Sequence, residues 1–393
     1  MIPITGQYAE AKIFTDNVES GALQQIYNLC NQSFAKNSTL RFMPDVHMGK
    51  GCTVGTTITI SDKICPNLVG VDIGCGMLTY ILNVPKISFE KLDDIIRNKV
   101  PFGSNIHTKP LKPFLKQINL EDLKCFEYID YKRAKNSIGS LGGGNHFIEV
   151  NKSSKDQLYL VIHSGSRYLG QQVCKYYQNK AIHYHKALYF TNVEKATAQC
   201  TENNTLDEIP LIKKELYVPP EFAYLEGQDF DDYIHDMKIV QRYAELNREA
   251  MGHIILSSLG ISTKNFFHTT HNYIDTEHMI LRKGAISAQE NELVLIPINM
   301  SDGSLLCKGK GNPDWNFSAP HGAGRLYSRS EAKNNLDFTE FEKSMKNVYS
   351  TCVRPKTLDE APQAYKPIKD ILDNIGDCVD VIEQLKPIYN FKP

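Results

Sequence analysis

The sequence lacks the features that mark several common classes of protein. It has no run of the roughly 18 apolar residues that a membrane helix needs, and its first residues form neither a basic nor an apolar targeting segment. Its 10 cysteines lie far apart, without a CxxC pair. Because this spacing gives no compact disulfide framework, we expect reduced cysteines, most of them in the core, and a cytoplasmic protein without a membrane partner.

The sequence also lacks an excess of charge of one sign. Its 44 Lys and Arg residues offset 45 Asp and Glu residues, so the formal net charge is -1. The overall charge therefore does not favour nonspecific binding to nucleic acid or membranes, and a polyanion would need a local patch. A content of 41% hydrophobic and 23% charged residues over 393 positions is typical of a globular protein with a sizeable core.

Familiar catalytic motifs are missing as well. The chain contains no G-x-x-x-x-G-K-[ST] phosphate loop, no H-E-x-x-H, no G-x-S-x-G and no K-x-D-G box. The glycine-rich stretch at residues 139–145 does not match G-x-G-x-x-G, so it gives little support to a dinucleotide-binding fold. A covalent nucleotide intermediate in this chain would therefore not use the lysine of a K-x-D-G box.

Glycines and β-branched residues alternate over much of the chain. Residues 51–60 and 67–82 are typical of strands joined by tight turns, residues 139–150 lead from a glycine loop into a strand, and residues 158–162 predict a strand with His163 at its end. The same pattern returns over residues 266–329. Residues 355–393 carry helix signals.

Residues from about 168 to 259 have a different pattern. Apolar side chains recur there at steps of three and four residues, as on one face of an amphipathic helix: Phe230, Tyr233, Met237, Val240 and Ala244. We therefore predict one α+β domain over residues 1–393. It would have a β-rich central body, surrounding helices and a helical insertion at about 168–259.

Histidines are the first candidates for chemistry. Four of them lie in glycine- or asparagine-rich loops or at strand ends, where a ring nitrogen is exposed: His146, His163, His271 and His321. Four others lie in helical segments and are interpreted as surface or packing residues: His183, His185, His235 and His253. The site, if one exists, should therefore form around the first group.

Asp72 and Cys75 share a loop with three glycines. A carboxylate and a thiolate can face one centre from such a loop, and imidazoles would complete a mixed oxygen, nitrogen and sulfur metal site. Taken alone, the spacing favours a simpler interpretation, in which a buried cysteine lies beside a turn-forming aspartate.

The segment SAPHGAGRLYSR at residues 318–329 places His321 before a Gly-Ala-Gly turn. Glycines allow a ligand to approach the backbone closely, and Arg325 and Arg329 suit an anionic ligand such as phosphate. A tight glycine turn followed by a solvated arginine explains the same residues equally well.

Eight segments in one order are more specific than any single motif. They are MPDVHMGKGCTVG, GVDIGCGM, GSLGGGNHFIEV, HSGSRYLG, THNY, RKGA, PHGAGRLYSR and EAPQAYK. Together they closely resemble the RtcB family of RNA ligases, from about Met43 to Lys392. The resemblance implies an RtcB-type fold and a GTP- and Mn2+-dependent enzyme. Its substrates would be RNA ending in a 2',3'-cyclic phosphate or 3'-phosphate and RNA bearing a 5'-hydroxyl, in RNA repair or tRNA processing.

The resemblance also implies roles for individual residues. His321 would attack the α-phosphate of GTP and carry GMP, which would then pass to the RNA 3'-phosphate. Cys75 would bridge two Mn2+ ions, with Asp72 and His146 completing one site and His163 and His271 the other. An imidazole nitrogen is a competent phosphoryl acceptor and leaving group, so a covalent step on histidine is chemically reasonable.

The family's GMP contacts correspond to residues in five parts of the chain. They are Asn145, His146, Phe147, Ile148, Glu149, His271, Asn272, Pro297, Ile298, Asn299, Met300, Ser304, His321, Gly322, Ala323, Gly324 and Lys392. Candidates for contacts with RNA or triphosphate are Arg282, Lys283, Arg325 and Arg329, although each could instead be structural. His47 either touches phosphate or shapes its loop.

Three departures from the family pattern stand out. Ile298 and Asn299 replace a glycine and a serine beside the nucleotide, Leu281 replaces a common histidine, and Pro393 replaces a final glycine. The first change puts nucleotide affinity and base selectivity in question. Two other functions are compatible with the residues, a dinuclear metal phosphatase or nuclease that does not need His321 and a noncatalytic module that binds RNA ends.

Overall fold

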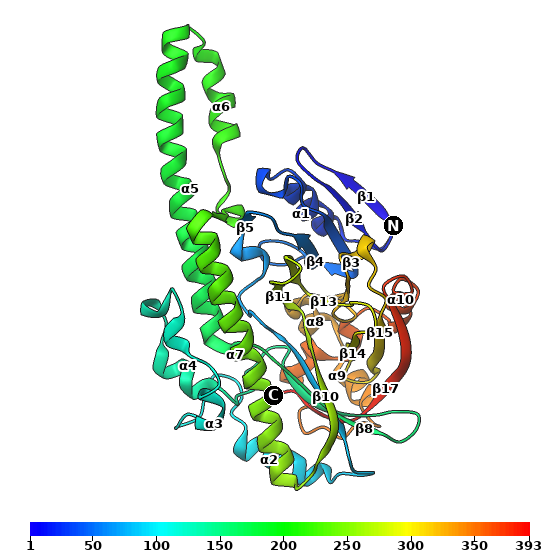
Figure 1. Ribbon diagram of the computed structural model, residues 1–393. Coiled ribbons are helices and arrows are strands. Elements are labelled where there is room, and N and C mark those ends of the chain that lie inside the picture. Colours follow the sequence, from blue (N-terminus) through cyan, green and yellow to red (C-terminus); the bar gives the residue numbers. More distant parts are fainter.

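The computed structural model describes all 393 residues as an α+β protein with two large sheets and a helical layer (Figure 1). A six-stranded sheet has the order β1-β2-β3-β4-β12-β11, and only the pair β2 and β3 is parallel. Its strands are β1 (Ile2–Thr5), β2 (Glu10–Ile13), β3 (Leu40–His47), β4 (Val54–Thr59), β12 (Ile280–Lys283) and β11 (Asn272–Asp275).

The second large sheet is antiparallel and has the order β10-β6-β8-β7-β17-β15-β14. Its strands are β10 (Thr263–Thr270), β6 (Gly76–Leu82), β8 (Leu158–Ser164), β7 (Phe147–Lys152), β17 (Val379–Phe391), β15 (Gly303–Gly309) and β14 (Leu293–Asn299). Two small pairs complete the strands, β13 (Ala285–Ser287) with β16 (Ser318–Pro320) and β5 (Lys63–Ile64) with β9 (Leu225–Glu226). The strands expected around residues 51–60, 67–82, 139–150, 158–162 and 266–329 are present.

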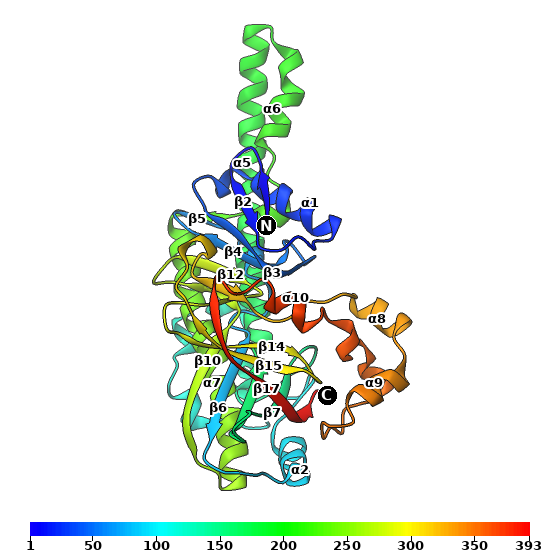
Figure 2. The ribbon, with the colours of Figure 1, turned by 90° about the vertical axis from the view of Figure 1, so that its right-hand side faces the viewer.

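The helices lie around these sheets. They are α1 (Ser20–Cys30), α2 (Phe89–Lys99), α3 (Lys112–Leu115), α4 (Tyr131–Ser137), α5 (Arg167–Asn203), α6 (Ile209–Leu216), α7 (Gly227–Leu259), α8 (Arg329–Asn335), α9 (Phe338–Ser344) and α10 (Ile368–Leu372). Figures 1 and 2 show that α6 and the end of α5 project beyond the body, whereas α7 runs along it. No helix combines the length and the apolar character needed to cross a bilayer.

Helix α7 forms part of the largest hydrophobic core. Four of the five residues on its predicted apolar face are fully buried, and Phe230 is partly buried against the same core. The buried surface extends further than that face, because Tyr243, Leu246 and Met251 are buried as well. The periodicity predicted this helix correctly. It did not predict that the polar residues Asp236, Asn247 and Arg248 are buried as well.

The expected helical end of the chain is wrong for its last part. Residues 379–391 form strand β17, which pairs with β7 on one side and β15 on the other. Favourable helix formers such as Glu383 and Gln384 are overridden because both edges of the strand enter antiparallel ladders. Pro387, which cannot donate a ladder hydrogen bond, lies beside a register shift.

Candidate active site

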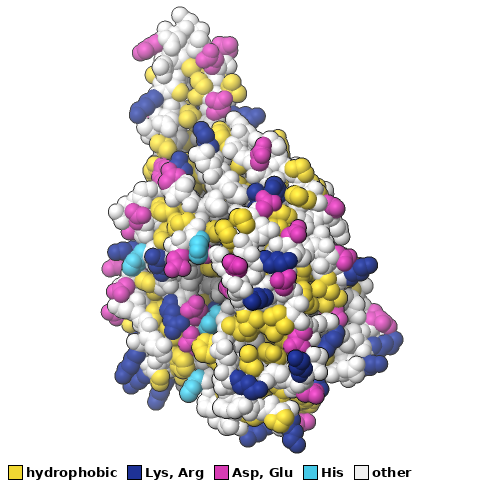
Figure 3. Space-filling view, turned by 45° about the vertical axis from the view of Figure 1, so that its right-hand side comes forward, with side chains coloured by type: hydrophobic (Ala, Val, Ile, Leu, Met, Phe, Trp, Pro, Cys, Tyr) yellow, Lys and Arg dark blue, Asp and Glu magenta, His cyan; other side chains and the backbone are white.

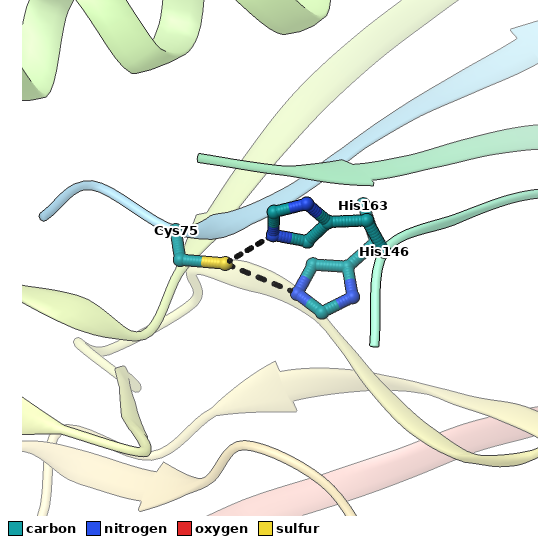
Figure 4. A group of neighbouring side chains, drawn as sticks. All are labelled: Cys75, His146 and His163. Carbon is teal, nitrogen blue, oxygen red and sulfur yellow. Dashed lines mark hydrogen bonds between the residues drawn. The ribbon is translucent and has the colours of Figure 1, made fainter. Parts of the chain in front are cut away.

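The five predicted metal ligands lie together at one edge of the seven-stranded sheet. The Cys75 Sγ atom is 3.4 Å from His146 Nε2 and 3.3 Å from His163 Nε2 (Figure 4). His163 Nε2 is 3.3 Å from His271 Nε2, and His146 Nε2 is 3.0 Å from the Asp72 carboxylate. All but Asp72 are buried. The structure thus forms a continuous row of ligand-type atoms.

Strand order explains this convergence. Neighbouring antiparallel strands β10, β6, β8 and β7 alternate in direction, so β6 and β7 begin where β8 and β10 end. Cys75 precedes β6, His146 precedes β7, His163 lies near the end of β8 and His271 follows β10. The loop before β6 comes so close to α7 that a Cβ on Gly74 would lie 2.7 Å from Ala244, and Gly74 also has a φ of +72°.

The ring nitrogens are oriented for metal binding. His146 Nδ1 lies 2.9 Å from the Leu141 carbonyl oxygen, and His163 Nδ1 lies 3.1 Å from that of Asn145. Since a carbonyl only accepts, each Nδ1–H donates, which leaves the Nε2 lone pair facing the cluster. Burial, followed by the repulsion that neighbouring imidazoles would exert if protonated, lowers the pKa of His163 and His271 well below the usual range and favours their neutral form. Neutral imidazole is the form that binds metals.

The Cys75 thiol shows why the residues fit a cation. Burial and the nearby Asp72 carboxylate raise the pKa of this thiol well above its usual range. A bound cation would reverse that effect and favour the thiolate, as metal ions do for coordinating thiols. The set of sulfur, nitrogen and oxygen donors suits Mn2+, Fe2+ or Zn2+. Cys75, His146 and His163 have ligand atoms that all lie within 4.8 Å of one another.

A first cavity of about 370 Å³ opens beside this cluster. It is lined by many predicted nucleotide contacts: Asn145, Phe147, Glu149, His271, Asn272, Pro297, Ile298, Asn299, Met300, His321, Gly322, Ala323, Gly324 and Lys392. Ile148 and Ser304 are absent from the lining and fully buried, and His146 lines another cavity. Ile148 joins a hydrophobic core because successive side chains of β7 point to opposite faces.

His321 is held by a carboxylate that sequence analysis did not single out. Asp45, fully buried at the end of β3, accepts a hydrogen bond of 2.6 Å from His321 Nδ1. The His321 ring also packs edge-on against His271, with ring centroids 5.1 Å apart. The only sequence signal for Asp45 is its place in the segment MPDVHMGKG, two residues before His47. His47 lines the first cavity and bonds the Asp45 backbone carbonyl through Nδ1.

Two buried charged residues, Lys392 and Glu149, line the first cavity. Lys392 Nζ lies 2.5 Å from a Glu360 carboxylate oxygen and near the faces of Phe147 and Tyr365. Glu149 accepts hydrogen bonds from Asn151 and Asn390, and burial raises its pKa to about 7. This part of the cavity therefore combines aromatic faces with the buried cation of Lys392 and the buried carboxyl group of Glu149.

The residues that depart from the family pattern have a local structural role. The Asn299 side chain accepts hydrogen bonds from the backbone N–H groups of Ser301 and Asp302 and donates one to the Asp302 carboxylate. Ile298 is 3% exposed within a hydrophobic core. These contacts stabilise the turn between β14 and β15 at the cavity wall.

The four cations expected to contact phosphate already form hydrogen bonds or ion pairs within the protein. Arg282 is fully buried, donates to Ser318 and Tyr273 and pairs with Asp275, so of its two expected roles the structure supports the structural one. Arg325 and Arg329 line the first cavity but already form ion pairs within the protein. Arg325 pairs with Glu360, and Arg329 pairs with both Asp359 and Glu360. Lys283 also lines it and donates to two backbone carbonyls.

A second cavity, of about 360 Å³, lies at the His146 end of the cluster. Asp72 and Asn145 line both cavities, and His146 lines only the second. Two arginines that sequence analysis did not assign point here. Arg133 stacks on Tyr168. Arg167 Nη1 lies 3.0 Å from His146 Nδ1, but this is a contact between two donors, because Nδ1–H donates to the Leu141 carbonyl. Neither arginine forms an ion pair. Their sequence signals, YKRAK and HSGSR, gave no indication that the two would meet.

An α+β fold with a buried row of metal-type ligands beside a carboxylate-bound histidine defines a candidate metalloenzyme. Comparison with known proteins identifies its family. A family model described as tRNA-splicing ligase RtcB matches residues 25–121 and 115–393, and the chain therefore belongs to the RtcB family.

Three relatives show how far the similarity extends. The RNA-splicing ligase RtcB of Escherichia coli K12 is 30% identical over 430 aligned positions, covering 99% of this chain and 98% of the relative. RNA-splicing ligase RtcB2 of another Escherichia coli strain is 26% identical, covering 95% and 93%. The tRNA-splicing ligase RtcB of Aeropyrum pernix is 25% identical, covering 97% and 93%.

Proposed function

We propose that this protein is an RNA ligase that joins a 2',3'-cyclic phosphate or 3'-phosphate end to a 5'-hydroxyl end, with GTP as co-substrate and Mn2+ as metal. Its membership of the RtcB family supports RNA ligation. The observation that carries the nucleotide-transfer chemistry is the hydrogen bond of 2.6 Å between His321 and Asp45, beside the ligand row.

Asp45 fixes the proton of His321. Because the carboxylate accepts from Nδ1, the Nε2 atom keeps its lone pair and serves as the nucleophile. Its attack on the α-phosphorus of GTP forms a P–N bond while the bond to pyrophosphate breaks. A 2',3'-cyclic phosphate end is first hydrolysed by water to the 3'-phosphate. The RNA 3'-phosphate then takes GMP from His321 as the P–N bond breaks, and the 5'-hydroxyl of the other strand attacks this activated end and releases GMP.

The ligand row is the proposed holder of two Mn2+ ions, with Asp72, Cys75, His146, His163 and His271 as ligands. The donor types fit this metal, and the Nδ1 hydrogen bonds of His146 and His163 aim Nε2 at the site. When bound, the cations would neutralise phosphate charge and orient the phosphorus for in-line attack.

The first cavity is the proposed GTP site. Lys392 and Glu149 present a donor and a titratable carboxyl group near the aromatic faces of Phe147 and Tyr365, an arrangement that suits a purine with mixed donors and acceptors. Gly322 and Gly324 in the lining allow the nucleotide to approach the backbone next to His321.

The second cavity is the proposed site of the RNA end. Arg133 and Arg167 line it without a carboxylate partner, and an arginine fork is well matched to phosphate. Since Asp72 and Asn145 line both cavities, an RNA phosphate there would lie next to the cluster and close to the nucleotide in the first cavity. The overall charge does not attract RNA, and Figure 3 shows both signs scattered over one face, so a local site is needed.

The first experiment is incubation of the purified protein with α-labelled GTP and Mn2+, followed by denaturation, for wild type and His321→Ala. We expect an acid-labile label on wild type alone. A His321→Ala protein that still carries label would overturn the assignment of the nucleophile. Release of RNA 3'-phosphate without GTP and without label would instead favour a dinuclear hydrolase, and RNA binding with neither activity would favour an end-binding module.

A further inference from the structure

Two consecutive polar residues of helix α7, Asn247 and Arg248, are fully buried in the body of the protein. Neither lines the first or the second cavity. Burying an amide and a guanidinium is unfavourable unless hydrogen bonds replace those lost from water. Their partners therefore show why these two side chains are in the interior.

The Asn247 amide joins the segments that carry two of the histidines. Its Oδ1 atom accepts hydrogen bonds from the N–H groups of Gly139 and Ser140, at 2.8 and 3.0 Å. Its Nδ2 atom donates to Ser164 Oγ at 3.1 Å and to the Gly165 carbonyl at 3.0 Å. Gly139 and Ser140 begin the loop that leads to His146, and Ser164 follows His163 directly, so one amide connects both ligand-bearing segments.

A relay of hydrogen bonds extends from Asn247 to the imidazole of His146. Ser164 Oγ, which accepts from Asn247, donates to the Leu141 carbonyl at 2.8 Å. The same carbonyl accepts from His146 Nδ1 at 2.9 Å. The orientation of the His146 ring therefore depends on atoms that Asn247 holds in place.

Arg248 joins the cysteine segment to the same strand end. Its Nη1 atom donates to the Gly74 carbonyl at 2.7 Å and to the Ser164 carbonyl at 2.8 Å. Gly74 precedes Cys75, and the ladder between β6 and β8 ends at the pair Gly76 and Ser164. Arg248 thus bridges the two segments just beyond the last ladder pair. The planar, delocalised guanidinium can make both bonds at once with little loss of side-chain freedom.

We propose that Asn247 and Arg248 are positioning residues for the ligase reaction, which hold Cys75, His146 and His163 at the separations a metal requires. This inference rests on the proposed function, in which those side chains bind the metal. Outer hydrogen-bond partners of ligands affect metal affinity by about 10- to 100-fold when they are changed. Here the partners come from one turn of one helix and connect three ligand segments.

The test measures metal binding by the full-length protein rather than catalysis. Wild type, Asn247→Asp and Arg248→Lys are titrated with Mn2+ by calorimetry and with Co2+ by absorption, since Co2+ reports ligand geometry through its visible bands and thiolate binding through a near-ultraviolet band. Asn247→Asp removes both donated bonds, and Arg248→Lys keeps the charge but has a side chain one bond too short to place its nitrogen where Arg248 Nη1 makes both hydrogen bonds. We expect each to bind about 10- to 100-fold more weakly and to show altered Co2+ spectra.

Asp236→Asn is the matched control, because Asp236 is another fully buried polar residue of α7. It accepts hydrogen bonds from Lys124 N, Cys125 N and Tyr177, all away from the cluster. We expect it to lower the melting temperature while metal affinity and the Co2+ spectrum stay at wild-type values. An equal loss of metal affinity in this control would mean that general destabilisation is responsible and would overturn the inference.

Ser164→Ala, a smaller change outside α7, keeps the inference testable if the α7 variants do not fold. Ser164→Ala removes the hydroxyl of the relay but keeps the backbone carbonyl that Arg248 contacts. We expect weaker metal binding here too. Unchanged affinity and spectra in Ser164→Ala and in the folded α7 variants would overturn the positioning role alone. A wild-type protein that binds neither ion would overturn the proposed function together with this inference.

Discussion

The two cavities beside the ligand row differ in whether their arginines form ion pairs with carboxylates of the protein. In the first cavity Arg325, Arg329 and Lys392 pair with acidic residues of the protein itself. In the second cavity Arg133 and Arg167 have no such partner. Paired cations suit a ligand recognised by shape and directed hydrogen bonds, whereas unpaired arginines suit a ligand that brings its own negative charge. The contrast supports recognition of the nucleobase of GTP beside the paired cations of the first cavity and of an RNA phosphate by the unpaired arginines of the second, while the proposed metal ions would neutralise the phosphates of GTP.

The largest expected effect belongs to Asp45→Asn, which tests the nucleotide side of this contrast. Without the carboxylate, His321 loses the partner that holds its proton on Nδ1. We expect the rate of GMP-histidine formation to fall by on the order of 10³- to 10⁴-fold, as for a carboxylate that orients a catalytic histidine. Rapid-quench measurement with labelled GTP checks this, with thermal melting as a control for folding. A rate within a few-fold of wild type would show that Asp45 does not orient the nucleophile.

Glu149→Gln tests the buried carboxyl group of the first cavity. Burial raises the pKa of Glu149 in the folded protein from 4.5 to about 7. Between these values the folded state binds more protons than the unfolded chain, so stability decreases as pH rises through this window. We expect wild type to lose about 3 kcal/mol more unfolding free energy than Glu149→Gln between these two pH values.

Urea unfolding across this pH range provides the measurement. Glu383→Gln, in strand β17 of the same sheet, is the control and should follow the wild-type profile. Parallel profiles for wild type and Glu149→Gln would contradict the raised pKa.

Arg133→Ala tests the second cavity. Loss of a charge-assisted hydrogen bond to phosphate should lower kcat/KM for sealing by about 10- to 100-fold, while GMP-histidine formation without RNA stays unchanged. Lys135→Ala on the same helix is a matched control, because Lys135 lies over Tyr131 and does not line the cavity. If Arg133→Ala reduced GMP-histidine formation as strongly as sealing, the division of ligands between the cavities would be wrong.

The smallest effect is expected for Arg329→Ala. This side chain is 45% exposed and already paired with Asp359 and Glu360. Exposed pairs contribute up to about 1 kcal/mol, so the KM for GTP should change by less than about 5-fold. A steady-state assay of GTP dependence measures this change. A much larger increase in KM would identify Arg329 as a direct triphosphate contact and weaken the contrast between the cavities.

Sequence alone predicted the parts of the site that lie within recognisable segments. The expected metal ligands Asp72, Cys75, His146, His163 and His271 were assigned through the resemblance to the RtcB family, because each stands in one of the segments that carry it. Their spacing in the structure follows from the order β10-β6-β8-β7, which no local pattern encodes. The α+β class and the long helices were predicted by the same kind of local periodicity.

The residues that were missed depend on distant packing. Asp45 meets His321 from a position 276 residues away, and Arg133 reaches the second cavity from a helix with no distinctive motif. For Arg282 the sequence left a phosphate-binding and a structural role open, because its partners come from two other segments of the chain that no local motif connects to it. The helix signals at the end of the chain were extended too far, into β17, whose ladder partners in β7 and β15 lie far away in sequence.

The position of β17 has a consequence for biosynthesis. It is the last strand in sequence but lies between β7 and β15, near the middle of its sheet. During translation the strands on its two sides cannot become one sheet until it has emerged. The two halves expose unpaired edges until then, which makes the growing chain prone to aggregation. Lys392 follows this strand directly, so the first cavity is completed in the same late step.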